Sequence, residues 1–200
     1  MRAHLGPALR LALLMTVVLG LVYPAVMTGI GELFFPARAN GSLVVRHGTV
    51  VGSRLIGQSF TAARFFQGRP SATTPPYNAA ASTPSNYGPT NPALLKEVQT
   101  NLAAVQQANP GVSSRSVPPD LVESSGSGLD PDISPAAALL QVPRVARVNH
   151  LPVAAIRKLV ESRIRGRFLG IYGDPYVNVL ELNLAIARMA TRSATAGASG

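Results

Sequence analysis

The pattern of apolar and polar residues divides the chain into an N-terminal apolar run and a longer mixed region. The run from Leu11 to Gly31 contains no charged residue, and Arg10 and Glu32 bound it. As a helix, its 21 residues would span about 31 Å, close to the ~30 Å hydrocarbon core of a bilayer. The pattern therefore predicts one transmembrane helix over residues 11–35.

Beyond this run the hydrophobic pattern changes several times, as is typical of one domain with short strands and several helices. β-branched residues on both sides of Arg46-His47-Gly48 predict a hairpin within residues 42–60. Residues 68–91 are rich in Pro, Ser, Thr and Asn and predict a long loop. Apolar residues three or four apart then predict a helix that begins at Pro92 and ends before Asn109.

The C-terminal part of the chain contains further helix signals. Ser134-Pro135 predicts the start of a helix that Pro143 should kink or end, because proline has no N–H to donate. Residues 177–189 fit both strand and helix spacing and favour a helix, and residues 191–200 are expected to form a disordered tail. A helix that starts at Pro152 is expected to bury Val153, Ile156, Leu159, Val160 and Ile164.

The predicted fold class is α+β, with a single N-terminal transmembrane helix followed by one domain over residues 36–190. The orientation follows from charge, because the tail of residues 1–10 carries Arg2, Arg10 and the terminal amine without an acid. Such a tail is expected to stay in the cytoplasm, which makes the domain extracytoplasmic. The alternative is a signal peptide that is cleaved after Ala37-Arg38-Ala39.

The composition argues against several kinds of chemistry. The chain has no cysteine, so it has no disulfide framework and no thiol nucleophile. Neither Lys96 nor Lys158 lies in a phosphate-binding-loop frame, and the three histidines lack the spacing of metal ligands. We therefore predict no catalytic residue, no metal site and no cofactor bound by this chain alone.

The densest polar segment, residues 120–132, is the natural place for an active site. A triad of Ser127, Asp130 and His150 is conceivable, and a membrane-anchored envelope serine hydrolase that uses Ser125 or Ser127 is one alternative function. Neither serine lies in a G-x-S-x-G frame, however. The simpler interpretation is a turn in which Ser and Asp side chains cap the backbone.

Positive charge gathers near the C-terminal end of the domain, where only Glu161 opposes it. This basic cluster is typical of a surface that binds lipid headgroups or an acidic partner, or simply of a solvated helix face. An anionic-ligand binding module is therefore a second alternative function. Nucleic acid is not expected outside the cytoplasm. The basic residues are Arg144, Arg147, Arg157, Lys158, Arg163, Arg165 and Arg167.

Taken together, several segments resemble the C chain of the bacterial Kdp-type potassium-transporting ATPase. The resemblance covers nearly the whole chain. It departs from the family at Asp132, where histidine is common, and at Val148-Asn149-His150. The matching segments are GSRLIGQ at 52–58, Phe66, RPSA at 69–72, residues 77–78, 85–86, 88–92 and 120–122, SGSGLDP at 125–131, ISPAAA at 133–138, residues 144–146 and VNVLELNL at 177–184.

The resemblance implies a non-catalytic accessory subunit of a high-affinity potassium uptake complex in the bacterial inner membrane. Its partners would be a channel-like potassium-binding subunit, a P-type ATPase subunit and membrane lipid, and the complex would handle ATP and potassium. The family is also described as a catalytic chaperone that raises the ATP affinity of the ATPase subunit, with Gln58 as a suggested contact. An extracytoplasmic Gln58 would have to act on cytosolic ATP through the partner subunits.

The partner surface is expected to lie on the Asn- and Pro-rich loop and on the Ser-Gly-Asp turn. The candidate contact residues are Asn86, Asn91, Ser125, Ser127 and Asp130.

Overall fold

The computed structural model describes residues 2–198 and divides the chain into two compact units, Met1–Ser53 and Arg54–Gly200. The first unit contains the apolar run and a hairpin. The second contains the remaining helices and two short strands. The α+β fold class expected from the sequence is confirmed.

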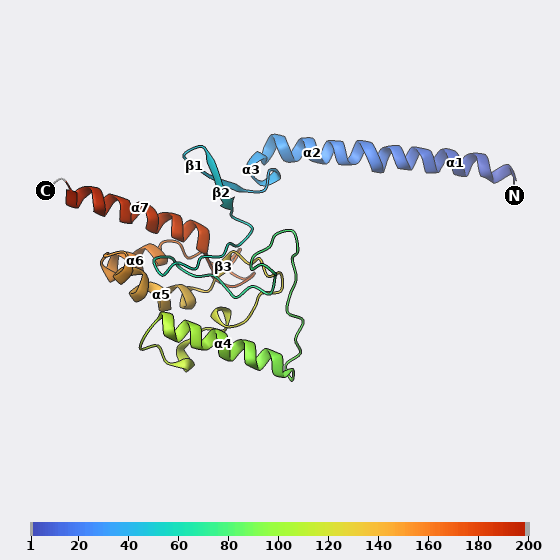
Figure 1. Cartoon of the computed structure of the whole chain (residues 1–200). Coiled ribbons are helices and arrows are strands. Elements are labelled where there is room, and N and C mark those ends of the chain that lie inside the picture. Colours follow the sequence, from blue (N-terminus) through green and yellow to red (C-terminus); the bar gives the residue numbers. More distant parts are fainter. Residues whose placement is uncertain (1, 199–200) are drawn as a thin grey trace. The chain divides into compact units, whose positions relative to one another are not determined.

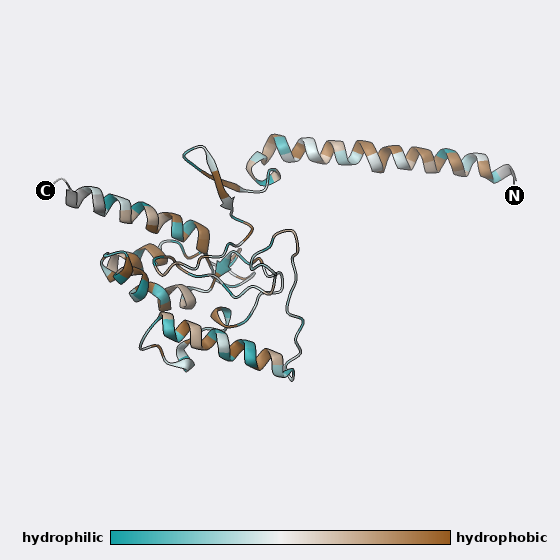
Figure 2. Ribbon diagram, in the orientation of Figure 1, coloured by the Kyte–Doolittle hydropathy of each residue, from teal (hydrophilic) through white to brown (hydrophobic). Residues whose placement is uncertain are grey.

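The first unit begins with one long helix, formed by α1 (Arg2–Val17), the π-helical turn Val18–Val22 and α2 (Tyr23–Phe34) (Figure 1). Apolar residues predominate along this helix, with polar residues mainly toward its two ends (Figure 2). The π turn lies directly before Pro24, and the Tyr23 N–H bonds to the carbonyl five residues back. A π turn at this place accommodates the proline, which has no N–H and would crowd the preceding turn of a regular α-helix.

A short helix and a hairpin complete the first unit. Helix α3 (Pro36–Ala39) precedes β1 (Leu43–Arg46) and β2 (Thr49–Ser53), which pair antiparallel with a bulge between Val44 and Val45. The two loop residues, His47 and Gly48, have φ values of 51° and 79°. Two positive φ values form the type I′ turn that matches the twist of a hairpin. The hairpin prediction is confirmed, although β2 ends at Ser53.

Four helices and a two-stranded antiparallel ladder form the second unit. Asn91 caps the first of these helices by accepting a hydrogen bond from Ala93 N–H, at the position that the sequence predicted. Two 3₁₀ turns lie between the first and second helices. The elements are α4 (Pro92–Ala108), the 3₁₀ turns η2 (Ser114–Ser116) and η3 (Pro119–Leu121), β3 (Asp132–Ile133), α5 (Pro135–Val148), α6 (Val153–Glu161), β4 (Val177–Asn178) and α7 (Val179–Ala198).

The hydrophobic core of the second unit lies where α5, α6 and α7 meet. Phe66, from a segment without regular structure, is fully buried among them. Val105 of α4 packs against the same core from outside. The fully buried core residues from the helices are Ala137, Ala138, Val142, Val145, Ala146, Ile156, Val160, Leu182 and Ile186.

Side chains, rather than a sheet, hold residues 63–67, which begin with a turn, on this core. The Asn183 amide accepts from Phe66 N–H at 2.8 Å and donates to Phe66 O at 2.9 Å. Gln141 forms the same pair of bonds with Gln67, at 2.8 and 3.1 Å. The buried Arg144 guanidinium donates to the Ala63 and Phe65 carbonyls. These polar groups replace the ladder partners that a buried backbone requires.

Two helix predictions differ from the structure. Helix α5 continues through Pro143 to Val148. The interior proline costs about 3 kcal/mol, but continuation of the helix beyond it buries Val145, worth roughly 1.5–3 kcal/mol, and also Ala146. Helix α7 reaches Ala198, so it covers most of the stretch that was expected to be a disordered tail, and residues 199–200 lie outside the described residues.

The buried face predicted for residues 152–164 is only partly correct. Ile156 and Val160 are fully buried, and Leu159 and Ile164 are partly buried, as expected. Val153, in contrast, is 48% exposed. It is the first residue of α6, and Leu151 packs against the core at this end of the helix instead.

This difference gives a matched pair of substitutions. Val160→Ala should lower the free energy of unfolding by about 2 kcal/mol, because two methyl groups leave a closed core. Val153→Ala removes the same atoms from an exposed site and should change it by less than about 0.5 kcal/mol. Urea denaturation of the full chain in detergent, followed by circular dichroism, measures both. Equal losses would show that the assignment of the α6 core face is wrong.

Candidate functional site

Tyr77 lies at the centre of a polar network that several family-like segments build together. Its hydroxyl donates to Arg69 O at 2.6 Å, and its N–H donates to Ser71 Oγ at 2.9 Å. Ser71 Oγ in turn donates to Gly128 O at 2.7 Å. The RPSA segment, Tyr77 and the Ser-Gly-Asp turn, which are far apart in the sequence, are thereby joined at one place.

Gly57, in the GSRLIGQ segment, packs directly against this network. Its N–H donates to Leu129 O at 2.8 Å. A Cβ atom on Gly57 would overlap the Tyr77 ring and would lie 2.5 Å from Asp130 O. Only glycine therefore fits without displacing the backbone of the Ser-Gly-Asp turn.

An ion pair fixes the other side of the same turn. Arg69 and Asp130 approach to 3.1 Å, and the second Asp130 oxygen accepts from Asp132 N–H at 3.0 Å. Arg69 also donates to Ser124 O at 3.4 Å. Both side chains of the pair are about three-tenths exposed or less, so solvent screens this pair less than a surface pair.

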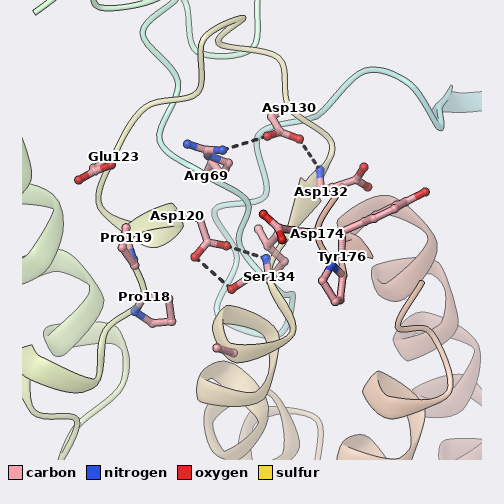
Figure 3. Close-up of a pocket in the computed structure, with 13 residues that line it drawn as sticks. Arg69, Pro118, Pro119, Asp120, Glu123, Asp130, Asp132, Ser134, Asp174 and Tyr176 are labelled. Atoms are coloured by element: carbon pink, nitrogen blue, oxygen red, sulfur yellow. Dashed lines mark hydrogen bonds and ion pairs between the residues drawn. The ribbon is translucent and has the colours of Figure 1, made fainter. Parts of the chain in front are cut away.

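A pocket of about 620 Å³ lies beside this ion pair (Figure 3). The chain carries a net charge of +9, yet five of its nine acidic residues line the pocket. Figure 3 shows dashed lines from Asp120 to Ser134, whose N–H lies 2.6 Å from the carboxylate. Within the described part of the chain, no group of three or more acidic or histidine side chains is arranged to hold a metal ion. The acidic residues that line the pocket are Asp120, Glu123, Asp130, Asp132 and Asp174.

Most of these carboxylates already have partners within the domain. Asp120 bonds to Ser134, which caps the start of α5. Asp132 accepts from the Asn178 amide at 2.9 Å, and Asp174 pairs with Arg167 at 3.2 Å. The first two contacts join Asp120 to the start of α5 and Asp132 to Asn178, directly before α7. The pocket is therefore lined by negatively charged side chains, most of which are held in place by contacts within the domain.

Burial changes the protonation of two groups at the site. Burial, with a smaller contribution from the Asp130 carboxylate, raises the pKa of Tyr77 to about 12. The phenol is thus neutral at pH 7 and remains a donor to Arg69 O. Burial also raises the pKa of Asp132, while the hydrogen bond from Asn178 opposes this shift.

The structure separates the residues of the conceivable serine triad. Ser125 is only 5% exposed, whereas Ser127 is exposed and its hydroxyl accepts from Leu129 N–H at 3.1 Å. The Asp130 carboxylate pairs with Arg69 rather than with a histidine. His150 is exposed and lies in the turn between α5 and α6. The turn interpretation of residues 120–132 therefore describes the structure better than the nucleophile interpretation.

The other sequence-based candidates occupy different environments. Asn91 is the cap of α4, and Asn86 is exposed in the long loop with φ at 55°. Gln58 is half-buried next to Gly57. A role in partner contact for Asn86, Asn91, Ser125, Ser127 and Asp130 stays a prediction.

Fewer of the seven basic residues contribute to a positively charged surface than the sequence suggested. Arg144 is buried, and desolvation followed by repulsion from Arg147 lowers its pKa to about 10. Arg165 pairs with Glu181 at 2.9 Å, and Arg167 pairs with Asp174. The sequence pattern marked all seven residues as one patch because it does not distinguish a core arginine from a surface one.

Sequence reasoning missed the roles of Arg69 and Tyr77. Both residues belong to segments that resemble the family, but the sequence assigned them no role. Only the fold brings Arg69 to Asp130, which is 61 residues away. Proline and serine neighbours of Arg69 indicated a loop, and a loop residue gives no signal of its distant partner.

The fold and the site define a class of protein in which one helix able to span a membrane carries an α+β domain braced by polar contacts. Residues 5–188 match the family model described as KdpC, the c chain of the K⁺-transporting ATPase. The potassium-transporting ATPase KdpC subunit of Methylobacterium nodulans is 53% identical over 95% of this chain and 99% of its own length. That of Methylococcus capsulatus is 52% identical over 92% of this chain and 96% of its own length.

A relative from Caldanaerobacter subterraneus, with the same subunit name, is 52% identical over 89% of this chain and 91% of its own length. The chain belongs to the KdpC family.

The close approach at Gly57 generates a prediction. Gly57→Ala should destabilise the second unit by about 1–3 kcal/mol, because the added methyl group overlaps Tyr77 and the Asp130 carbonyl. Gly126→Ala is the matched control, since no atom lies within 4 Å of a Cβ there. Thermal denaturation of both variants in the same detergent measures the difference. If Gly126→Ala cost as much, steric contact at Gly57 would not be the cause.

The raised pKa of Asp132 generates a second prediction. A folded-state pKa above the unfolded one means that the stability contributed by this group is lost as the pH rises through the folded value. Asp132→Asn removes that loss and keeps an acceptor for Asn178. The variant should therefore melt higher than the native chain at pH 7, and the difference should vanish below the ordinary pKa of 3.8.

The control for this experiment is Glu123→Gln, which removes a negative charge from an exposed residue of the same pocket. It should leave the melting temperature nearly unchanged across the same pH range. A lower melting temperature for Asp132→Asn at pH 7 would contradict the role of burial.

Proposed function

We propose that the chain is a non-catalytic accessory subunit of an ATP-driven potassium uptake complex in the bacterial inner membrane. The helix His4–Phe34 carries this proposal, because it is 31 residues long and is not buried by any other part of the described chain. It is long and apolar enough to cross a membrane. A subunit that is held beside integral membrane partners requires such a helix.

The orientation rests on charge. Arg2, Arg10 and the terminal amine precede the apolar run, whereas Glu32 and Arg38 offset each other after it. By the positive-inside rule the N-terminus is then cytoplasmic, and the second unit lies outside. Within the membrane, Gly20, Ala25 and Gly29 would allow a partner helix to approach closely.

The partners in this proposal are the channel-like potassium-binding subunit and the P-type ATPase subunit. The braced domain supports a role in assembly, because its polar groups serve the contacts within the chain rather than a reaction. ATP and potassium would be bound by the partners. An effect on ATP affinity, with Gln58 involved, would reach the cytosolic site as a coupling energy transmitted through them.

The rival functions lose support from specific observations. A serine hydrolase needs an accessible nucleophile with an acid and base beside it. The Ser125 side chain is buried, and Asp130, the acid of the conceivable Ser127 triad, pairs with Arg69. The basic cluster gives less support to an anionic-ligand binding module than the sequence suggested, because Arg144 is buried and Arg165 and Arg167 pair with carboxylates.

Co-purification from native membranes tests the proposal. The tagged full chain should bring a large P-type ATPase chain with it. A chain reduced to residues 1–53 should still enter the membrane but should recover that partner at least about ten-fold less, which corresponds to about 1.4 kcal/mol of lost binding. Potassium-limited growth should fail in parallel.

His150→Asn is the matched control, because His150 is exposed, belongs to the conceivable triad and is not a candidate partner contact. An accessory subunit with this change should keep both its partners and growth at low potassium, whereas a hydrolase would lose its activity. Full recovery of the ATPase chain by residues 1–53 would overturn the proposed role of the second unit.

A further inference from the structure

A short apolar loop between α6 and β4 stands out on the second unit. Phe168, Leu169, Ile171 and Tyr172 are 72%, 75%, 70% and 66% exposed. Phe168 and Tyr172 exchange two backbone hydrogen bonds, of 2.9 and 3.0 Å, and so close the loop into a tight turn. Four large apolar side chains are thus presented together on an ordered turn, which is costly in water and marks an interaction site.

The base of this loop is fixed at the point where the chain enters the second unit. Arg165 and Tyr176 exchange backbone hydrogen bonds of 2.8 and 3.0 Å. Glu181 pairs with Arg165 at 2.9 Å and with Arg54 at 2.8 Å. Arg54 is the first residue of the second unit, and only residues 35–53 separate it from the end of the membrane-spanning helix. Within the second unit, the base of the loop is therefore linked through Glu181 to Arg54, the first residue of that unit.

Exposed basic residues lie close to the loop in the sequence. Arg163, Arg165 and Arg167 precede it and are all exposed, and Arg157 and Lys158 lie on the exposed surface of α6. The acids in residues 157–175 are Glu161 and Asp174. Arg165 pairs with Glu181 and Arg167 pairs with Asp174, so Arg163, Arg157 and Lys158 carry the excess positive charge. An apolar and aromatic tip next to exposed basic side chains favours the boundary between acyl chains and anionic headgroups.

We propose that the loop Phe168–Tyr172 inserts into the interface of the same bilayer that holds the anchor helix, with the arginines at its base on anionic phospholipid headgroups. This inference rests on the proposed membrane anchoring. The lipid contact would give the domain a second attachment and limit its rotation above the partner subunits. A protein surface as the occupant is the competing outcome of the test.

The experiment uses the full chain in lipid nanodiscs. The chain has no tryptophan, so Phe168→Trp introduces a single reporter. In discs with phosphatidylglycerol its emission should shift to the blue, and brominated acyl chains should remove about half of its fluorescence. Leu95→Trp is the matched control, because Leu95 is 58% exposed on α4 and should stay unquenched.

Two further variants separate insertion from a local folding defect. Ile171→Trp places the reporter elsewhere on the loop and should be quenched like Phe168→Trp. Arg163→Gln combined with Arg167→Gln, or discs of phosphatidylcholine alone, should reduce the quenching, because the headgroup attraction is lost. Quenching independent of both changes would overturn the role of the arginines.

Solvent-like, unquenched emission from both loop reporters in discs that contain the chain would overturn the inference and leave the anchor intact. A blue shift without bromine quenching, seen only when the large partner subunits are present, would overturn it in favour of a protein contact. Co-elution with the discs is measured separately. Failure to co-elute would contradict the anchor itself, and with it the inference that depends on it.

Discussion

The need to cover the N-terminal helix is the constraint on which the rest of this protein depends. No other part of the described chain buries the 31 residues His4–Phe34. Their apolar surface is costly in water, whereas a bilayer accepts it, and the helix satisfies its own backbone hydrogen bonds there. Once this helix lies in the membrane, the second unit is confined to one surface. Its possible partners are then the lipids and proteins at that surface.

The second unit achieves its fold with few strands, because side chains take the role of a sheet. The amides of Asn183 and Gln141 hold the backbone at Phe66 and Gln67, and Asn178 both caps α7 and bonds to Arg54 O. Such contacts are directional and leave little freedom in the long loops. The segments that resemble the family therefore have a structural role, because they form the polar network that holds the domain in a single conformation. At Asp132, where the resemblance departs, the carboxylate still finds a partner in Asn178.

Local signals predicted those parts of the fold that depend on neighbouring residues. The His47-Gly48 turn, the Asn91 cap and the start of α5 at Ser134-Pro135 each follow from residues within one turn. The contacts of the site could not be predicted in this way, because Arg69 and Asp130 are 61 residues apart. The remaining differences follow from burial of side chains. The sequence indicated that Pro143 would kink or end α5, but the helix continues to Val148. The sequence also indicated that Arg144 was a surface charge, but this side chain is buried.

The most direct test of the proposed orientation is whether protease can reach the second unit in intact spheroplasts. Protease added to intact spheroplasts should digest residues 54–200 and leave a membrane-protected fragment that contains the apolar helix. Digestion that occurs only after the cells are opened would place this unit in the cytoplasm. That result would contradict both the proposed orientation and the role built on it.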